Sequence, residues 1–388
     1  MAPQSDLFIE FLKQFGKNSD TIRHFQAPAR INIIGEHVDY LGGIVLPAAI
    51  DFSIQCLVRP RDDFSIILYS NDFNHKTEIK RPFQNSEEHP WTDYIAGVIV
   101  ELESLGHSIP GFEMLIKGNI PQGAGLSSSA ALEVLIGYAL STIFQIPLTK
   151  PEIAVIGQKA ENHFVGMKCG IMDQFIIANG KKDYCLSLDT ESLDFDYHHF
   201  DLGDHEFYLV NSNVKHSLKD SEYNTRRKEC ESALAKINQA GSAIPNLYSF
   251  NLNEVEWDRF GFTESETKRV KHVTSEKKRT NAIIQALGSG NFAEVGKSLY
   301  DCHWSLSRNF EVSCKETDEI VSILYKSEAL GARMIGGGFG GCVLVLDKVI
   351  NFSKTSVELE KSYQQKFGYT VDFYKFKISD GVKEIIHS

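Results

Sequence analysis

The sequence predicts an α+β protein of two domains, and three observations support this fold class. The chain has 388 residues, which exceeds the usual size of one hydrophobic core. Up to about residue 180, short strand-like apolar runs alternate with segments of helical spacing. Beyond that point the pattern changes, and residues 250–330 are mostly helical in spacing. No Pro- or Ser-rich linker marks a boundary, so we place the two domains at residues 1–180 and 181–388.

The elements of the first half follow from the spacing of apolar residues. A Ser-Asp start followed by apolar residues at helical spacing predicts a helix over residues 5–16. A strand that begins at residue 22 is expected to break at Pro28. Apolar runs between turn residues predict strands over residues 42–70. The same criteria predict a helix over 91–106, a strand over 111–121, and helices over 126–145 and 152–166.

The helix over residues 126–145 is the longest apolar one, and Glu133 is its only charged residue. A helix that is apolar nearly all round is expected to be buried. Residues 173–189 are expected to form a loop or helix end followed by strands. In the second half we expect a strand over 205–218, an amphipathic helix over 221–240, a strand after the glycines that precede Cys342, and a terminal strand over 369–379.

Composition excludes several classes of function. A formal net charge of −11 argues against nucleic acid as the main partner, because binding a phosphate backbone needs a basic face. No apolar run is long enough for a signal peptide or a membrane span. The seven cysteines show no CxxC pair or zinc-ligand spacing, which indicates reduced thiols in a cytoplasmic protein. They are Cys56, Cys169, Cys185, Cys230, Cys302, Cys314 and Cys342.

Residues 121–131 read PQGAGLSSSAA and are called here the Gly-Ser segment. Glycine lets the backbone approach a ligand closely, and the N-terminus of a helix presents unpaired N–H groups with partial positive charge. The three serines can cap the helix, hold phosphate oxygens or ligate magnesium. The segment is neither a Walker A loop nor a Rossmann loop, because the residues that define those motifs are missing.

Two further segments concentrate unusual residues. Residues 27–47 read APARINIIGEHVDYLGGIVLP and crowd together the polar residues Arg30, Asn32, Glu36, His37 and Asp39, which can hydrogen-bond several hydroxyls of one small polyol. Residues 331–342 read GARMIGGGFGGC and are called here the Gly-rich segment. Its backbone suits close approach to a phosphate or to another loop.

These three segments, in this order and spacing, resemble the GHMP kinases. RINIIGEHVDYLGG is similar to the galactokinase signature, as are GMKCGIMDQF at residues 166–175 and SEYNTRRKEC at residues 221–230. The resemblance covers nearly the whole chain and implies a two-domain GHMP-kinase fold with the active site in the cleft between the domains. Three positions depart from the usual pattern: Ala29 replaces Gly, Val38 replaces Thr, and Leu41 replaces Asn in the loop near the sugar.

The resemblance implies roles for individual residues. Asp173 corresponds to the catalytic aspartate beside the C1 hydroxyl of galactose, and Arg30 corresponds to the arginine that pairs with it. Ser129 and Glu161 match the ligands of Mg²⁺, and Trp91 matches an aromatic residue of the adenine pocket. The positions that match the sugar-binding residues are Glu36, His37, Asp39, Gly170, Asp173 and Tyr223. The positions that match the ATP phosphate loop are Gly123, Ala124, Gly125, Leu126, Ser127, Ser128 and Ser129.

These roles fit the physical demands of phosphoryl transfer, which needs in-line positioning and neutralisation of charge. Arg30 is expected to stabilise charge on the γ-phosphoryl group and to keep Asp173 ionised. Asp173 could then accept the C1 hydroxyl proton, a contribution typically worth ~10²–10⁴ in rate. Whether Asp173 acts as a true base or only orients the hydroxyl stays open at this stage.

The resemblance therefore implies an ATP- and Mg²⁺-dependent galactokinase that acts on small molecules, without nucleic acid or membrane partners. The family includes monomers, so the resemblance allows a monomer. Two alternatives remain open. One is a related kinase for N-acetylgalactosamine or arabinose, which Leu41 and Met167 do not settle. The other is a regulator that binds galactose and ATP without turnover, against which the intact SSSAA sequence, Arg30 and Asp173 all argue.

Overall fold

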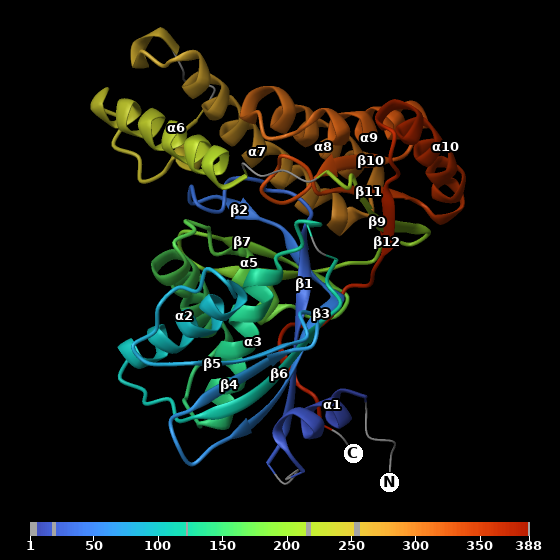
Figure 1. Cartoon of the computed structure of the whole chain (residues 1–388). Coiled ribbons are helices and arrows are strands. Elements are labelled where there is room, and N and C mark those ends of the chain that lie inside the picture. Colours follow the sequence, from blue (N-terminus) through green and yellow to red (C-terminus); the bar gives the residue numbers. More distant parts are fainter. Residues whose placement is uncertain (1–5, 18–20, 122, 215–218, 252–256, 387–388) are drawn as a thin grey trace.

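The computed structural model describes residues 6–17, 21–121, 123–214, 219–251 and 257–386. Figure 1 shows a half built largely from the first part of the chain, in blue and green, and a second half of mainly helical segments in yellow to red. The elements up to residue 199 are α1 (Asp6–Phe15), β1 (Arg23–Asn32), β2 (Ile44–Val45), β3 (Pro47–Pro60), β4 (Ile66–Ser70), β5 (His75–Ile79), α2 (Trp91–Ser104), β6 (Phe112–Gly118), α3 (Ser128–Ile143), α4 (Lys150–Lys159), η1 (Ala160–Val165), α5 (Met172–Asn179), β7 (Tyr184–Asp189) and β8 (Phe195–His199). The elements that follow are β9 (His205–Asn211), α6 (Lys219–Gln239), η2 (Leu247–Ser249), η4 (Trp257–Phe260), α7 (Glu264–Ser289), α8 (Phe292–Ser305), η5 (Leu306–Phe310), α9 (Lys315–Lys326), β10 (Gly331–Met334), β11 (Cys342–Lys348), α10 (Val349–Phe367), β12 (Asp372–Lys375) and β13 (Lys383–Glu384).

A six-stranded sheet in the order β13-β1-β3-β6-β4-β5 organises the first half. Its pairs are antiparallel except β4 with β6. Because side chains alternate between the faces of a strand, Leu57, Tyr69 and Leu115 share one face, where they pack against Leu7 and Phe11 of α1. Helices α3 and α5 contact β1 and β3 and lie within the main core. The sheet is thus covered on both faces.

The predicted break at Pro28 is wrong, because β1 continues through this residue to Asn32. The register of β1 against β3 shifts between Pro28 and Ala29, which is a β-bulge. On its other side β1 pairs with β13 only at Phe25 and Gln26. Proline lacks an N–H to donate, and an unpaired edge beside a bulge is where a strand accommodates it. The strand can therefore carry Arg30 beyond the proline toward the middle of the molecule.

Helix α3 is buried, as the sequence predicted, and Glu133 within it has no exposed surface. The predicted helix over 152–166 is α4, which starts at a capping box formed by Thr149 and Glu152 and continues into the π-helix η1. Where a loop or helix end was expected at the start of residues 173–189, the structure has nearly the whole of the short helix α5, and the expected strand follows as β7.

A four-stranded antiparallel sheet in the order β10-β11-β9-β12 lies in the second half. Helices α9 and α10 pack on it, in a smaller core that includes Val210, Val343 and Leu359. The strand expected over 205–218 ends at Asn211 as β9, and residues 215–218 lie outside the described residues. The expected helix over 221–240 is α6, and the terminal strand is the short β12.

The end of the chain returns to the first half. Lys383 and Glu384 form β13, which pairs with β1, and Ile378 forms a bridge with Ile50. The strands β2, β7 and β8 form a separate three-stranded sheet. The division of the chain near residue 180 remains a prediction.

Three residues that depart from the family pattern lie in the main core. Ala29 and Val38 have no exposed surface, and Leu41 is 7% exposed. Leu41 is therefore a packing residue and does not line the pocket described below. Among the described residues, which include all seven cysteines, no disulfide is formed. Within the described ranges, none of the helices is long and apolar enough to cross a membrane.

Candidate active site

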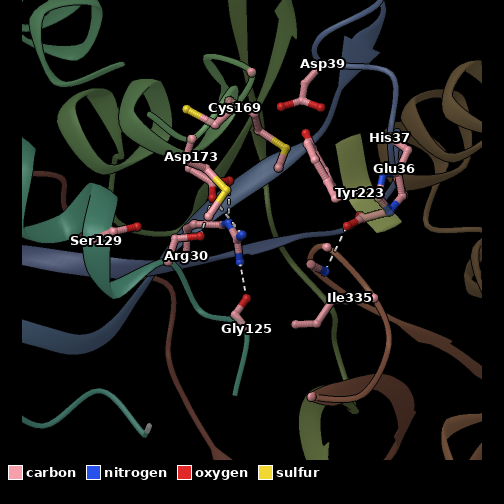
Figure 2. A pocket seen from close by; sticks show the side chains of 18 of the residues that line it. Arg30, Glu36, His37, Asp39, Gly125, Ser129, Cys169, Asp173, Tyr223 and Ile335 are labelled. Carbon is pink, nitrogen blue, oxygen red and sulfur yellow. Dashed lines mark hydrogen bonds and ion pairs between the residues drawn. The ribbon is translucent and has the colours of Figure 1, made fainter. Parts of the chain in front are cut away.

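A pocket of about 320 Å³ brings together residues from distant parts of the chain. Figure 2 shows Arg30 and Asp173 on the left, Tyr223 of α6 and Ile335 on the right, and Asp39 at the top above Tyr223. The candidate residues that line it are Arg30, Glu36, His37, Asp39, Gly125, Ser127, Ser129, Glu161, Gly170, Asp173 and Tyr223. Five glycines of the Gly-rich segment also line it, so all three segments chosen from the sequence meet here.

Arg30 and Asp173 form a two-pronged ion pair at the pocket. Nε of Arg30 donates to Oδ1 of Asp173 at 2.7 Å, and Nη2 donates to Oδ2 at 2.9 Å. The third donor, Nη1, binds the carbonyl oxygen of Gly125 at 2.7 Å. The side chain of Arg30 is only 5% exposed, whereas that of Asp173 is 28% exposed. The guanidinium of Arg30 is therefore held in a buried position by Gly125 and Asp173, whereas the carboxylate of Asp173 stays accessible to a molecule in the pocket.

Ser127 lies just before α3 in the left-handed conformation, with φ of 60°. Its hydroxyl does not cap the helix, so the interpretation of this serine as an ordinary helix cap is wrong. The hydroxyl donates instead to Oδ2 of Asp173. This contact could not be predicted from the sequence, because it joins two residues 46 positions apart. It links the Gly-Ser segment directly to the candidate catalytic carboxylate.

The Gly-Ser segment lies against the Gly-rich segment. Gly123 and Gly125 both have positive φ, and the buried side chains of Ala124 and Leu126 anchor the turn. A Cβ at Gly336 would lie 3.1 Å from the carbonyl oxygen of Gly125, so the two backbones can meet only where side chains are absent. The close approach to another loop expected for the Gly-rich segment is thereby confirmed. Ser128 is exposed and is the first residue of α3.

Glu36 lies in the loop of residues 33–43, called here the β1–β2 loop, and both of its carboxylate oxygens have partners. The backbone N–H of Gly336 donates to Oε1 at 2.8 Å, and Nδ2 of Asn32 donates to Oε2 at 2.8 Å. Arg333 forms an ion pair with Oε2 at 2.8 Å. The carboxylate therefore joins the β1–β2 loop to the Gly-rich segment, in addition to lining the pocket.

His37 lines the pocket and has one buried ring nitrogen without a partner among the described residues. Its Nδ1 lies 3.1 Å from the hydroxyl of Tyr40, while Nε2 is buried and has no hydrogen-bond partner among the described residues. The ring packs against Phe310 and Tyr223, with centroids 4.8 and 5.7 Å away. Burial lowers the pKa of His37 to about 3, so the imidazole is neutral near pH 7. A buried polar atom of this kind is satisfied by a ligand or by water.

Asp39 and Gly170 are in direct contact. A Cβ on Gly170 would lie only 2.0 Å from Oδ2 of Asp39, so the carboxylate occupies the space of the missing side chain. Burial and the nearby carboxylates of Asp173 and Glu36 raise the pKa of Asp39 to about 7. This position therefore offers a hydrogen-bonding group whose charge changes near neutral pH.

Ser129 and Glu161 form a second polar cluster at the pocket. Oε2 of Glu161 accepts from Nε2 of Gln174 at 2.7 Å and from the thiol of Cys169 at 3.2 Å, and its carboxylate is also hydrogen-bonded by Ser129. The same Gln174 nitrogen donates to Glu133 at 2.9 Å. Burial raises the pKa of both Glu161 and Glu133. The cluster holds Glu161 by one oxygen and presents oxygen ligands from two side chains.

Trp91 does not line this pocket. It is the first residue of α2, and its ring stacks on that of Phe73 with centroids 6.4 Å apart. Its indole nitrogen is buried without a partner in the described part of the chain. The role of Trp91 toward adenine stays a prediction.

Sequence reasoning did not select Cys169, Met172 or Ile335, which also line the pocket. Cys169 and Met172 each neighbour a selected residue, Gly170 and Asp173, and Ile335 lies within the Gly-rich segment. Their position beside the motifs was the available signal. Nothing about an apolar residue or a single thiol by itself indicates a ligand site.

Family models match three regions of the chain. Residues 9–60 match the galactokinase galactose-binding signature. Residues 93–181 match the N-terminal domain of the GHMP kinases, and residues 283–351 match their C-terminal domain.

Curated relatives cover almost the full length. A galactokinase of Thermosipho africanus is 43% identical over 361 residues, which is 93% of this chain and 99% of that protein. A galactokinase of Clostridium tetani is 40% identical over 385 residues, which is 98% of this chain and 97% of that protein. The crystal structure of Lactococcus lactis galactokinase complexed with galactose superimposes with a TM-score of 0.93 at 35% identity, covering 97% of this chain and 98% of that one. The Methanococcus jannaschii mevalonate kinase shares the fold at 20% identity, with a TM-score of 0.65, over 94% of this chain and all of that one.

Proposed function

Because the chain belongs to the galactokinases, a family of the GHMP kinases, we propose that its pocket holds galactose beside the triphosphate of ATP, with Asp173 and Arg30 at the point of transfer. The protein is an ATP-dependent sugar kinase. It transfers the γ-phosphoryl group of ATP to the C1 hydroxyl of α-D-galactose and produces galactose 1-phosphate and ADP. The assignment of roles to individual residues is the proposal developed below.

The observation that carries the proposal is the ion pair of Arg30 with Asp173 at the meeting point of the three segments. Asp173 accepts or orients the C1 hydroxyl proton, since its carboxylate is the exposed member of the pair. Arg30 is held by three hydrogen bonds and brings a permanent positive charge to the transferred phosphoryl group. Because Ser127 also binds Asp173, the position of this carboxylate is coupled to that of the Gly-Ser segment.

The sugar is held by Glu36, His37, Asp39 and Tyr223, with Gly170 providing room for Asp39. His37 contributes its unpartnered Nε2, and Asp39 contributes a carboxylate that is already at the pocket surface. Tyr223 brings α6 to the sugar from the second half of the chain. Several polar groups that converge on one small cavity are typical of recognition of a polyhydroxylated ligand.

ATP lies on residues Gly123 to Ser129, with Trp91 at the adenine. The residues also fit Mg²⁺, which Ser129 and Glu161 would hold. Both side chains offer the oxygen ligands that this ion prefers, and Mg²⁺ is usually bound by one or two protein groups plus phosphates and water. Among the described residues, no group of three or more His, Cys, Asp or Glu is arranged to hold a metal. When bound, Mg²⁺ neutralises phosphate charge.

We also propose a cytoplasmic protein that acts on small molecules. The cysteines, which form no disulfide among the described residues, support the compartment, and the family resemblance allows a monomer. The two domains are proposed as residues 1–180 and 181–388, with the pocket between them.

The proposal is tested by measuring ADP release with Mg·ATP and six acceptors: galactose, N-acetylgalactosamine, glucose, arabinose, mevalonate and homoserine. We expect turnover with galactose, and its loss in Asp173→Asn by ~10²–10⁴-fold. A preference for N-acetylgalactosamine or arabinose would reject the substrate. Galactose binding without turnover by the parent protein would identify a sensor and reject the kinase.

The magnesium site is tested with Ser129→Ala. The KM for Mg·ATP should rise and Mn²⁺ binding should weaken, while the Kd for galactose measured without nucleotide stays unchanged. Ser141→Ala is the matched control, because Ser141 lies on the same helix and its hydroxyl binds the carbonyl of Tyr138. An equal loss of galactose binding and Mg·ATP binding in Ser129→Ala would contradict the assignment.

A further inference from the structure

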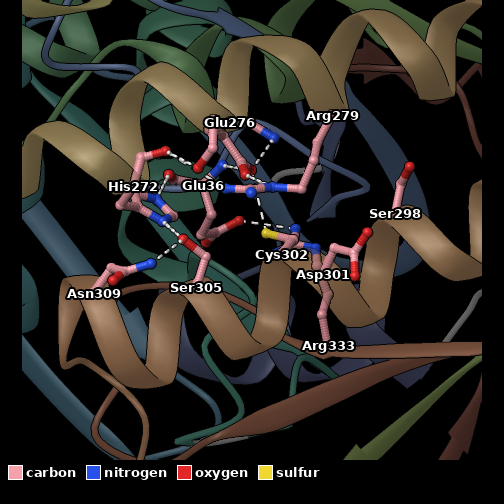
Figure 3. A network of polar contacts seen from close by, with 12 residues as sticks. Glu36, His272, Glu276, Arg279, Ser298, Asp301, Cys302, Ser305, Asn309 and Arg333 are labelled. Atoms are coloured by element: carbon pink, nitrogen blue, oxygen red, sulfur yellow. Dashed lines mark hydrogen bonds and ion pairs between the residues drawn. The ribbon is translucent and has the colours of Figure 1, made fainter. Parts of the chain in front are cut away.

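Buried polar side chains from the second half of the chain form hydrogen bonds and an ion pair with the β1–β2 loop. Figure 3 shows Glu36 of this loop surrounded by His272, Glu276 and Arg279 of α7, and by Cys302 of α8 with Arg333 below. The contacts of these residues with the loop join positions that are 236 to 300 residues apart in the sequence. None of His272, Glu276 or Arg333 lines the pocket, so their contacts with the loop are not contacts with a ligand.

Glu276 makes the central contacts. Its Oε1 accepts the backbone N–H groups of Gly35 and Glu36 at 2.9 and 3.0 Å, together with the thiol of Cys302 at 3.2 Å. Its Oε2 accepts Nε of Arg279 at 2.6 Å. Glu276 has no exposed surface. Although burial opposes a charge, Arg279 and His272 lower the pKa of this carboxyl to about 2. The loop backbone therefore rests on a permanent, buried negative charge.

His272 and Arg333 also bind the β1–β2 loop. Nε2 of His272 lies 3.0 Å from the carbonyl oxygen of Glu36, which can only accept, so this nitrogen carries the proton. Its Nδ1 lies 3.0 Å from the hydroxyl of Ser305, and burial lowers the pKa of this histidine to about 4. Arg333 donates from Nε to the carbonyl of Ile33 at 2.9 Å and pairs with the carboxylate of Glu36. The N–H and C=O of Glu36 and its side chain are thus all held by one half of the molecule.

We propose that Glu276 is a positioning residue for galactose: it fixes the backbone at Gly35 and Glu36, and thereby the place of Glu36, His37 and Asp39 at the sugar. This inference rests on the proposed sugar contacts of these residues. A rigid support is required because side chains that bind a ligand must be held within a fraction of an ångström of the productive geometry. Among the described residues of the Gly-Ser segment, none forms a hydrogen bond or ion pair with Glu276, so the binding of nucleotide should depend on this residue far less.

The test compares Glu276→Gln with Glu266→Gln. Glutamine has one acceptor oxygen, so it cannot serve both the loop N–H groups and Arg279. Glu266 is the matched control, because it lies on the same helix, is 5% exposed, and pairs with Lys236 and Ser232 away from the loop. Its pKa is also lowered to about 2, with Lys236 opposing the effect of burial. The measurements are the Kd for D-galactose by calorimetry without nucleotide, and the KM for Mg·ATP.

We expect Glu276→Gln to weaken galactose binding about tenfold or more, the usual effect of losing a hydrogen bond to a charged group, with the KM for Mg·ATP within twofold. Glu266→Gln should leave both constants within twofold. A galactose Kd within twofold in Glu276→Gln overturns the inference. Equal losses for galactose and Mg·ATP, or equal losses in Glu266→Gln, also overturn it, because they indicate a general effect on folding.

Two additional variants separate the possible failures. Asp39→Asn tests the proposed sugar site itself. If this variant weakens galactose binding while Glu276→Gln does not, the proposed sugar site is supported and the positioning role of Glu276 is rejected. If Glu276→Gln does not fold, His272→Phe replaces it, since phenylalanine keeps the packing on Phe310 and removes the donor to Glu36. His272→Phe should then raise the galactose Kd severalfold, and an unchanged Kd overturns the inference.

Discussion

Replacing Gly170 by alanine should impair galactose binding by displacing Asp39. The added Cβ would lie 2.0 Å from Oδ2, 2.4 Å from Cγ and 3.1 Å from the backbone carbonyl carbon of Asp39. Ordinary van der Waals contact begins at 3.4 Å, so the carboxylate must retreat by more than an ångström. Rotation of the side chain relieves the contact with Oδ2, but the contact with the backbone stays tight. Asp39 then leaves the position from which it faces the pocket.

The expected magnitude follows from the lost contact. A hydrogen bond to a charged group is worth about 1.5–3 kcal/mol, which corresponds to a galactose Kd about 10- to 150-fold higher. Overpacking costs a further 1–3 kcal/mol of folding free energy, roughly, and should lower the melting temperature. The Kd is measured by calorimetry with D-galactose alone. Gly288→Ala is the control, since a Cβ at Gly288 meets nothing within 4 Å. A galactose Kd within twofold of the parent value in Gly170→Ala would refute the reasoning.

Two other predictions concern stability. The pKa of Asp39 is raised to about 7, so its contribution to stability is present at acid pH and is lost as pH rises through about 7. Asp39→Asn should therefore melt at a higher temperature than the parent at pH 8, and this difference should shrink toward pH 5. A difference in melting temperature that stays constant over this range, measured without galactose, would argue against the raised pKa. Leu135 of α3 has no exposed surface, so Leu135→Ala should lower the free energy of unfolding by about 2–5 kcal/mol in urea titrations. A loss below about 1 kcal/mol would mean that the surrounding residues relax around the smaller side chain.

The sequence predicted those features that depend on local pattern. The buried helix α3 is apolar nearly all round, and the strand after the Gly-rich segment is a short continuous apolar run, so both are visible in the local sequence. Helix α6 forms where a helix was expected, although its apolar residues do not gather on one side. The strand does not break at Pro28 as expected, because a β-bulge and an unpaired edge at this residue mean that its missing N–H leaves no hydrogen bond unmade. Whether a strand edge is paired depends on partners far away in the chain, and local spacing does not report them.

Most candidate site residues were found through motifs, yet the contacts among them were not. Arg30 was expected to pair with Asp173, and this prediction is confirmed. Its bond to the carbonyl of Gly125, and that of Ser127 to Asp173, depend on the turn geometry of the Gly-Ser segment. Glu36 was selected for the sugar alone, whereas its carboxylate also holds Arg333. Charged residues on an amphipathic helix such as α7 look solvated in sequence, so burial of Glu276 could not be predicted.

The pairing of β13 with β1 has a consequence for the order in which the molecule is assembled. Glu384 binds opposite Phe25, which is 359 positions earlier in the chain. During synthesis, the strand that carries Arg30 is made among the first segments, but the edge at Phe25 and Gln26 stays open until nearly the whole chain has emerged. Open strand edges invite pairing with other chains, and contacts of such long range form late. A nascent chain that stops before residue 383 therefore leaves the edge at Phe25 and Gln26 open, directly upstream of Arg30.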